Sequence, residues 1–193
     1  MMDIRALCVY CGSSSKVRQS HLQAARALGS LAAQAEVEIV YGGGRVGLMG
    51  AVAEGAMAAG GRVVGIIPQH LEDLEAGNRA ASEYIAVQSM HARKQLMAER
   101  SDAFCALPGG LGTLDETFEI ITWRQLKLHD KPVILVNIEG FWDPLLRLIE
   151  YQTAEGYLRG ATGLFHVVER VDQVLEAATM APRPSLPDKI ERM

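Results

Sequence analysis

The chain has little cysteine, and the cysteine it has forms no recognisable framework. Its three cysteines, Cys8, Cys11 and Cys105, are too few to predict a set of disulfides. Cys8 and Cys11 have the spacing of a metal-binding pair, but residues three apart on a strand point to opposite faces of a sheet. No second pair exists to complete a zinc site. We therefore expect structural cysteines and no metal.

Long apolar runs and an excess of positive charge are also missing. No stretch reaches the roughly 18 uncharged apolar residues that indicate a transmembrane helix. Residues 1–5 lead directly into a predicted strand and lack the apolar centre and cleavage site of a secretory signal, so we expect a cytoplasmic protein. The formal net charge of −4 argues against a general nucleic-acid or membrane binder.

What the chain does have is a regular alternation of apolar runs and helical patterns over residues 1–180. A length of 193 residues predicts one domain. The predicted strands are continuous runs of Val, Ile, Ala and Leu, which is typical of a parallel sheet buried on both faces. The expected fold is a Rossmann-like three-layer α/β fold. Residues 181–193 are rich in proline and are predicted to be a flexible tail.

Apolar periodicity places the individual elements along the chain. The expected strands are 5–10, 37–41, 62–67, 84–87, 103–107, 132–137 and 167–168, and the expected helices are 20–34, 47–59, 91–100, 113–128, 142–150 and 171–180. Ligands of such sheets bind beyond the carboxyl ends of the strands. The loops expected to converge there are 11–15, 42–44, 68–82 and 108–113.

The most informative segment is 108–116, which reads Pro-Gly-Gly-Leu-Gly-Thr-Leu-Asp-Glu. It joins a predicted buried strand to a predicted helix, and a strand, a glycine loop and a helix together form a phosphate site. The glycines let backbone N–H groups approach an anion closely, and the helix N-terminus adds a partial positive charge. We expect Thr113 to cap the helix and to donate its hydroxyl to a phosphate oxygen.

Glu116 follows Thr113 by three residues, on the same side of the first helical turn. A second negative charge would weaken the binding of an anion, so a carboxylate at this position indicates catalysis. The alternative is a tight turn whose glycines serve packing and whose glutamate complements the helix dipole. The complete pattern, in its strand–loop–helix setting, favours the functional interpretation.

Residues 42–47, Gly-Gly-Gly-Arg-Val-Gly, match the G-x-G-x-x-G pattern of dinucleotide-binding loops. That pattern also requires an acidic residue at the end of the next strand, to hold the ribose hydroxyls. Residues 66–69 read Ile-Ile-Pro-Gln and supply none. We therefore interpret Gly43 and Gly44 as part of the wall of a mononucleotide site. The alternative is that these glycines only allow close helix packing.

Three motifs in register resemble the LOG (Lonely Guy) family, cytokinin-activating nucleotide phosphoribohydrolases long mislabelled as lysine decarboxylases. They are Pro-Gly-Gly-x-Gly-Thr-x-x-Glu at 108–116, Val-Gly-Leu-Met-Gly at 46–50 and Met-His-x-Arg-Lys at 90–94. Arg93 precedes Glu116 by 23 residues, as in the family. Family members commonly carry Glu where this chain has Ala92. The resemblance extends from about residue 5 to about residue 175.

The resemblance implies an enzyme that hydrolyses the N-glycosidic bond of AMP, or of an N6-modified adenosine 5′-monophosphate, to the free base and ribose 5-phosphate. It implies Arg93 and Glu116 as catalytic residues and requires neither cofactor nor metal. His91 is interpreted as a packing or capping residue. Glu75 and Thr122 align only loosely with substrate-contacting positions. The implied substrate-binding residues are Gly43, Gly44, Glu75, Met90, Arg93, Lys94, Gly109, Gly110, Leu111, Gly112, Thr113, Leu114, Asp115, Glu116 and Thr122.

Two other functions fit parts of the sequence. Non-catalytic nucleotide or molybdenum-cofactor carriers share the Gly-Gly-x-Gly-Thr loop, but they do not need both Arg93 and Glu116. Lysine decarboxylation by pyridoxal phosphate requires a lysine Schiff base and an acidic partner for the ring nitrogen. Of the five lysines, only Lys94 could lie near the site. Both alternatives are therefore disfavoured. The sequence leaves open which base is preferred, because the purine pocket is expected to involve the 68–82 segment, which varies within the family.

The predicted helix 113–128 has a wider apolar surface than a helix that covers a sheet requires. Part of this surface is therefore available to a twofold-related copy of the chain. The resemblance also implies a dimer, with the active site near the subunit boundary, so we expect a homodimer. The apolar residues concerned are Phe118, Ile121, Trp123, Leu126 and Leu128.

Overall fold

The computed structural model describes residues 3–72, 77–158 and 163–180. Its strands are β1 (Ala6–Tyr10), β2 (Glu38–Tyr41), β3 (Val63–Pro68), β4 (Glu83–Val87), β5 (Ala103–Ala106), β6 (Val133–Val136) and β7 (His166–Val168). Its α-helices are α1 (Gln19–Gln34), α2 (Gly47–Ala58), α3 (Met90–Glu99), α4 (Leu111–Gln125), α5 (Asp143–Ala154) and α6 (Val174–Met180). Short 3-10 turns are η1 (Gln69–Leu71), η2 (Ile138–Gly140) and η3 (Val171–Gln173). None of the helices in these ranges combines the length and the hydrophobicity that crossing a membrane requires.

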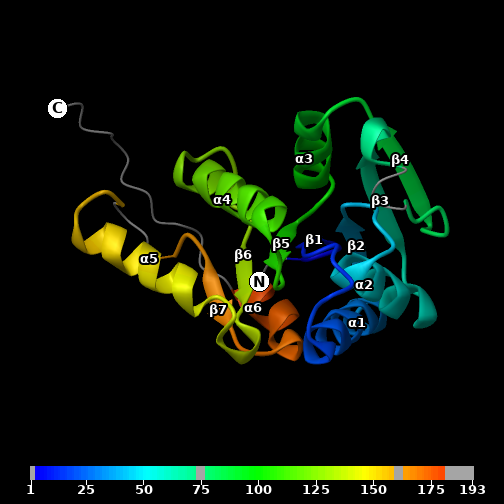
Figure 1. Cartoon of the computed structure of the whole chain (residues 1–193), viewed down its shortest axis with the longest axis horizontal. Coiled ribbons are helices and arrows are strands. Elements are labelled where there is room, and N and C mark those ends of the chain that lie inside the picture. Colours follow the sequence, from blue (N-terminus) through cyan, green and yellow to red (C-terminus); the bar gives the residue numbers. More distant parts are fainter. Residues whose placement is uncertain (1–2, 73–76, 159–162, 181–193) are drawn as a thin grey trace.

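The strands form one parallel sheet in the order β4-β3-β2-β1-β5-β6-β7. Figure 1 shows α3 and α4 on one side of this sheet and α1, α2 and α6 on the other. The predicted Rossmann-like three-layer fold is therefore confirmed. The predictions made for the tail 181–193 and for Glu75 lie outside the described residues.

Burial on both faces explains why the central strands are unbroken apolar runs. Every residue of β1, β5 and β6 is buried. Side chains of β1 alternate between the two faces: Leu7 and Val9 pack with α1, α2 and α6, whereas Cys8 and Tyr10 pack with α3 and α4. The sheet therefore contributes side chains to two hydrophobic cores, one on each face.

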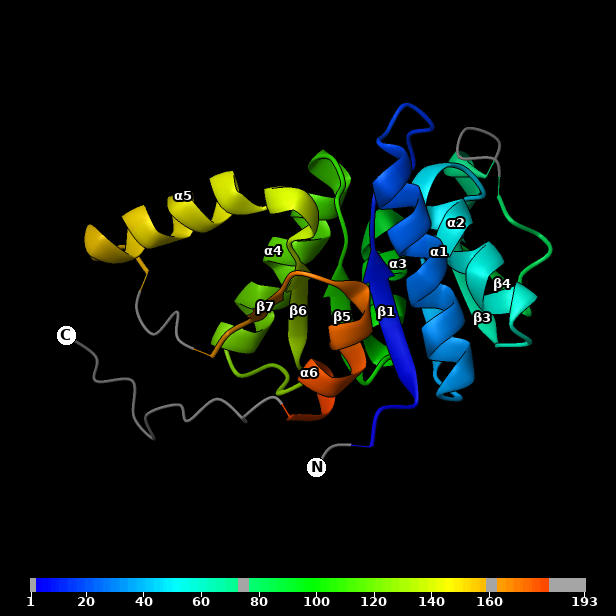
Figure 2. The same cartoon turned by 90° about the horizontal axis from the view of Figure 1, so that it is seen from below.

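The direction of chain winding reverses between β1 and β5, which are neighbours in the sheet. Figure 2 shows the two strands side by side, with the loops that follow them rising at the same edge of the sheet. The backbone N–H of Gly12, after β1, donates to the carbonyl of Pro108, after β5, over 3.1 Å. Such a reversal leaves a crevice between the two loops, and α/β proteins bind ligands there.

The boundaries of α4 differ from the sequence prediction at both ends. The helix begins at Leu111, with Gly110 as an N-cap that has no side-chain hydrogen bond. Thr113 therefore lies inside the first turn, and the prediction that it caps the helix is wrong. The helix ends at Gln125, because Lys127 takes a left-handed φ of 63°.

Smaller differences occur near the C-terminus of the described chain. Helix α5 continues to Ala154, beyond the predicted end at residue 150. The predicted helix 171–180 is divided into η3 and α6. These elements lie away from the crevice between β1 and β5, so the differences leave its walls unchanged.

Candidate active site

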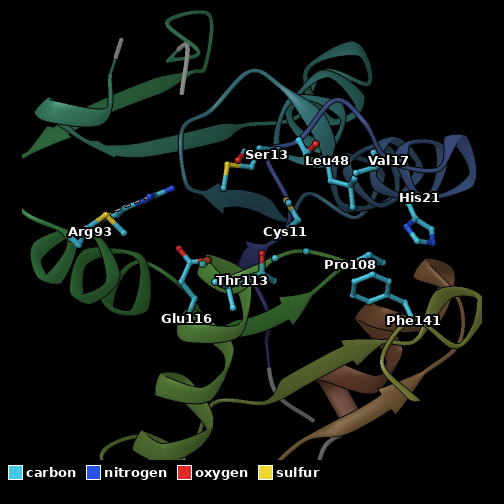
Figure 3. A pocket seen from close by; sticks show the side chains of 18 residues that line it. Cys11, Ser13, Val17, His21, Leu48, Arg93, Pro108, Thr113, Glu116 and Phe141 are labelled. Carbon is cyan, nitrogen blue, oxygen red and sulfur yellow. Dashed lines mark hydrogen bonds between the residues drawn. The ribbon is translucent and has the colours of Figure 1, made fainter. Parts of the chain in front are cut away.

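A cavity of about 410 Å³ opens where the loops after β1 and β5 meet (Figure 3). Loops 11–15 and 108–113 both contribute to its wall, together with the first turns of α1, α2, α3 and α4 and the residue after η2. The lining residues are Cys11, Gly12, Ser13, Ser14, Val17, His21, Leu48, Met49, Met90, Arg93, Pro108, Gly109, Gly110, Leu111, Gly112, Thr113, Glu116 and Phe141.

The glycine loop delivers the N-terminus of α4 to this cavity. The first N–H groups of an α-helix have no acceptor within the helix, and Gly110 provides no side-chain cap. Thr113 is buried and lines the cavity, and its carbonyl accepts a hydrogen bond of 2.6 Å from the Thr117 hydroxyl. Backbone donors and the positive end of the helix dipole therefore face the cavity, as an anion site requires.

Glu116 follows one turn later on the same face of α4. It is 5% exposed and lines the cavity. Cys11, directly after β1, lines the same cavity. Burial raises the pKa of the Cys11 thiol, and the negative charge of Glu116 raises it further. The Glu116 side chain therefore forms part of the cavity wall and is largely shielded from bulk water.

Arg93 reaches the same end of the cavity from α3. Ser89 caps this helix by accepting a hydrogen bond of 3.1 Å from the N–H of Ala92. The capping residue is therefore Ser89 and not His91, which the sequence had suggested as a packing or capping residue. Arg93 is 2% exposed, and its Nη2 donates to the Gly42 carbonyl over 2.9 Å. Figure 3 shows Arg93 and Glu116 directed into one end of the cavity from opposite helices.

Lys94, next to Arg93, points away from the cavity. Its ammonium group contacts Asp115 at 3.0 Å and Glu119 at 3.1 Å, both on α4. Burial lowers the pKa of Lys94, but the hydrogen bonds to the two carboxylates outweigh burial and leave this pKa raised. The structure therefore gives Lys94 and Asp115 a different contact from the predicted substrate contact: they join α3 to α4.

Several other predicted substrate-binding residues do not line the cavity. Leu114 packs against a small core cluster around Trp142, and Thr122 is exposed two turns further along α4. Gly43 and Gly44 are buried and are not among the lining residues, and Gly44 forms a β-bridge with Gly77. The interpretation of the glycine run as a cavity wall is therefore not supported for these two residues.

Packing accounts for the rest of the G-x-G-x-x-G pattern. Gly47 begins α2 with a φ of +65°, and a Cβ there would lie 2.5 Å from the Ser14 carbonyl oxygen. The N-terminus of α2 thus rests directly on the β1–α1 loop, and the Leu48 N–H donates to the Gly12 carbonyl over 2.9 Å. Gly47 therefore allows close packing of α2 on the loop that lines the cavity, in agreement with the alternative interpretation that these glycines serve helix packing.

Two residues at the opposite end of the cavity were not predicted from the sequence. His21, in the first turn of α1, and Phe141, after η2, meet there edge to face with ring centroids 5.7 Å apart. Burial lowers the pKa of His21, against the charge of Glu139, which raises it. Phe141 follows the carboxyl end of β6, so the rule for strand ends was a usable signal for it. His21 carried no such signal.

The three cysteines and Lys94 are all engaged in the protein interior or in ion pairs. Cys8, Cys11 and Cys105 are free and buried, and burial raises the pKa of all three thiols. Within the described ranges, no group of His, Cys, Asp and Glu is arranged to hold a metal ion. Lys94 is engaged by two carboxylates outside the cavity, so its position does not fit a Schiff base with a ligand there.

The chain matches known proteins over most of its length. The model of a family described as "Possible lysine decarboxylase" matches residues 49–178. A rice protein (Oryza sativa subsp. japonica) named probable cytokinin riboside 5′-monophosphate phosphoribohydrolase LOGL9 is 49% identical over 154 residues, covering 80% of this chain and 68% of its own. The Arabidopsis thaliana phosphoribohydrolase LOG3 is 46% identical over 154 residues, covering 80% of this chain and 72% of its own.

Solved structures support the fold. The molybdenum cofactor carrier protein of Chlamydomonas reinhardtii superposes with a TM-score of 0.69, covering 90% of this chain and 95% of its own, at 24% sequence identity. This likeness establishes a common architecture and carries no argument about ligand or activity. The sequence matches are much closer, and the family model covers the cavity-lining residues from Met49 onward. The chain therefore belongs to the family of the LOG phosphoribohydrolases.

Proposed function

We propose that the protein hydrolyses the N-glycosidic bond of adenosine 5′-monophosphates, either AMP or its N6-modified (cytokinin riboside) forms. The products are the free base and ribose 5-phosphate. The observation that carries this proposal is the placement of Arg93 and Glu116 in one cavity beside the uncapped N-terminus of α4. Membership of the LOG family, whose named members are phosphoribohydrolases, supports the same reaction.

The 5′-phosphate binds at the loop 109–113 in this proposal. Backbone N–H groups at the start of α4 and the Thr113 hydroxyl supply the donors, and the helix dipole favours the negative charge. The phosphate takes no part in bond cleavage. Its binding energy instead fixes the ribose against Glu116, so that a remote group assists the reaction.

Cleavage of the glycosidic bond places positive charge on the anomeric carbon in the transition state. The buried Glu116 carboxylate stabilises that charge or accepts a proton from the attacking water. Arg93 orients the ribose and the base with a planar guanidinium that stays charged at working pH. Water adds to the anomeric carbon as the bond to the base nitrogen breaks, and the departing base gains a proton.

The base lies beyond Arg93 at the end of the cavity that Met90 lines. The Met90 sulfur lies 3.8 Å from Arg93 Nη1, and a thioether offers an adaptable apolar surface to a purine. A carrier function without catalysis is the weaker candidate, because the likeness to carrier proteins is one of fold alone. A homodimer and a cytoplasmic location stay predictions at this point.

The reaction is tested by measuring free base released from AMP, isopentenyladenosine monophosphate and adenosine. We expect release from the monophosphates to be far faster than from adenosine, because adenosine lacks the phosphate anchor. Glu116→Gln should lower turnover on the order of 10²-fold or more while keeping the wild-type melting temperature. Glu54→Gln, an exposed carboxylate on α2, is the matched control. Wild-type turnover by a folded Glu116→Gln protein would exclude this mechanism.

A further inference from the structure

Arg93 lies so close to the backbone of Gly42 that no side chain fits between them. Its Nη2 donates to the Gly42 carbonyl over 2.9 Å. A Cβ built on Gly42 would lie 1.9 Å from Arg93 Nη2, 3.0 Å from Arg93 Cζ and 3.0 Å from the terminal methyl of Met49. The guanidinium therefore occupies the space that any other residue at position 42 would fill.

We propose that Gly42 is a positioning residue for Arg93. Its carbonyl supplies an acceptor for the guanidinium, and its missing side chain supplies the room. Gly42 itself does not line the cavity, so it acts on a bound nucleotide only through Arg93. This inference rests on the proposed function, which gives Arg93 its task of orienting the substrate.

The same contact explains why the first glycine of the G-x-G-x-x-G pattern is present although the acidic residue of a dinucleotide site is not. In dinucleotide-binding loops the glycines let the backbone approach a pyrophosphate. Here the backbone of the first glycine is approached by a guanidinium of the protein itself. Gly42 lies directly after β2, and Arg93 lies in the first turn of α3. The contact thus joins two segments 51 residues apart in the chain.

Replacing Gly42 by alanine should change the position of Arg93 without disturbing the fold. Gly42 is not among the residues with a positive φ, so alanine is able to adopt its backbone conformation. The atoms that an alanine methyl would meet are the far ends of the flexible Arg93 and Met49 side chains. Gly42→Ala should therefore move the guanidinium while leaving the fold intact.

The test compares Gly42→Ala, Arg93→Ala and the double variant by kcat and KM on AMP and by melting temperature. Displacing a positioned group by about 1 Å can cost on the order of 10²-fold, so we expect Gly42→Ala to lose between about tenfold and about 10²-fold in kcat/KM. The double variant should be no slower than Arg93→Ala. Independent losses that multiply in the double variant would overturn the proposal, since Gly42 would then act without Arg93.

A second readout is independent of activity. The N–H signal of the Arg93 Nε in a ¹H–¹⁵N spectrum is identified by its loss in Arg93→Ala, and it should shift in Gly42→Ala while most backbone signals stay unchanged. An unmoved signal would overturn the positioning role. If the wild-type protein released no base at all, the proposed function would fail, and this spectrum would still decide where Gly42 places Arg93.

Discussion

Thr113 and Gly109 set the shape of the loop 109–113, the proposed phosphate site, through close packing. A Cβ on Gly109 would lie 2.1 Å from the Thr113 hydroxyl oxygen, 2.5 Å from its Cβ and 2.8 Å from its methyl carbon. Thr113 is unable to yield easily, because its side chain is β-branched and buried and its carbonyl is bonded to Thr117. Gly109 is therefore required for close packing of the loop on the first turn of α4.

Gly109→Ala should push the loop away from the helix N-terminus and weaken phosphate binding. We expect KM for AMP to rise on the order of tenfold, about the loss of one good hydrogen bond to a charged group, with a smaller change in kcat. Gly110→Ala is the comparison, because a Cβ there meets nothing within 4 Å. Steady-state kinetics and calorimetric titration with AMP measure both variants, and a larger effect at Gly110 than at Gly109 would contradict this account.

The His129 side chain binds the C-terminal half of helix α4, and its two ring nitrogens have different roles. His129 Nδ1 accepts from the Lys131 N–H over 3.1 Å, so Nε2 carries the hydrogen and donates to the Ile120 carbonyl over 2.8 Å. Burial lowers the pKa of His129 and outweighs the hydrogen bond to Ile120, which raises it, while the charges of Arg124 and Lys131 lower it further. Protonation of Nδ1 would remove the acceptor for Lys131, so the folded protein requires the neutral ring.

Stability should therefore fall on acidification. Unfolded chains bind a proton at histidine below about pH 6.5, whereas folded His129 resists protonation, so the unfolded state gains protons first and is favoured. As the pH falls from about 7.5 to about 5, the contribution of His129 should lower the melting temperature. His129→Gln should reduce this slope, and His70→Gln, at an exposed residue, should leave it unchanged. Equal slopes in both variants would contradict the assignment.

At the scale of the whole molecule, apolar side chains remain exposed along and beyond α4. Phe118 is 38% exposed, Leu126 63% and Leu128 67%. Trp123 and Leu128 also border a groove of about 500 Å³ between α3 and α4. These exposed apolar side chains are consistent with the homodimer expected from the sequence, with this face as the contact surface.

Light scattering should give twice the mass of one chain. Leu126→Lys should dissociate the dimer, because it inserts a charge in the apolar face, and it should not harm the helix, since a cation is favourable at a helix C-terminus. Activity should fall with dissociation, because the cavity lies on α4 as well. Leu148→Lys on α5, 47% exposed, is the matched control. A fully active monomer of the wild-type chain at assay concentration would exclude this prediction.

The sequence by itself determined the sheet and the position of the glycine loop. Apolar runs buried on both faces predicted the strands, because such burial leaves no alternation of polar residues. The loop 108–112 was predictable because glycines between a strand and a helix serve a local backbone need. Helix ends were less predictable: Lys127 ends α4 with a left-handed φ, and its side chain type gives no signal for that conformation.

Only the tertiary structure decided where individual side chains of the site point. The sequence placed Arg93 and Lys94 side by side, yet Arg93 lies against Gly42 in the cavity wall and Lys94 binds Asp115 and Glu119 outside it. Likewise, His21 reached the cavity only through the packing of α1 beside η2. Periodicity reports on neighbours within one element, whereas these contacts join segments far apart in the chain. A glycine such as Gly42 indicates that space is required, and only the folded chain shows that an arginine fills it.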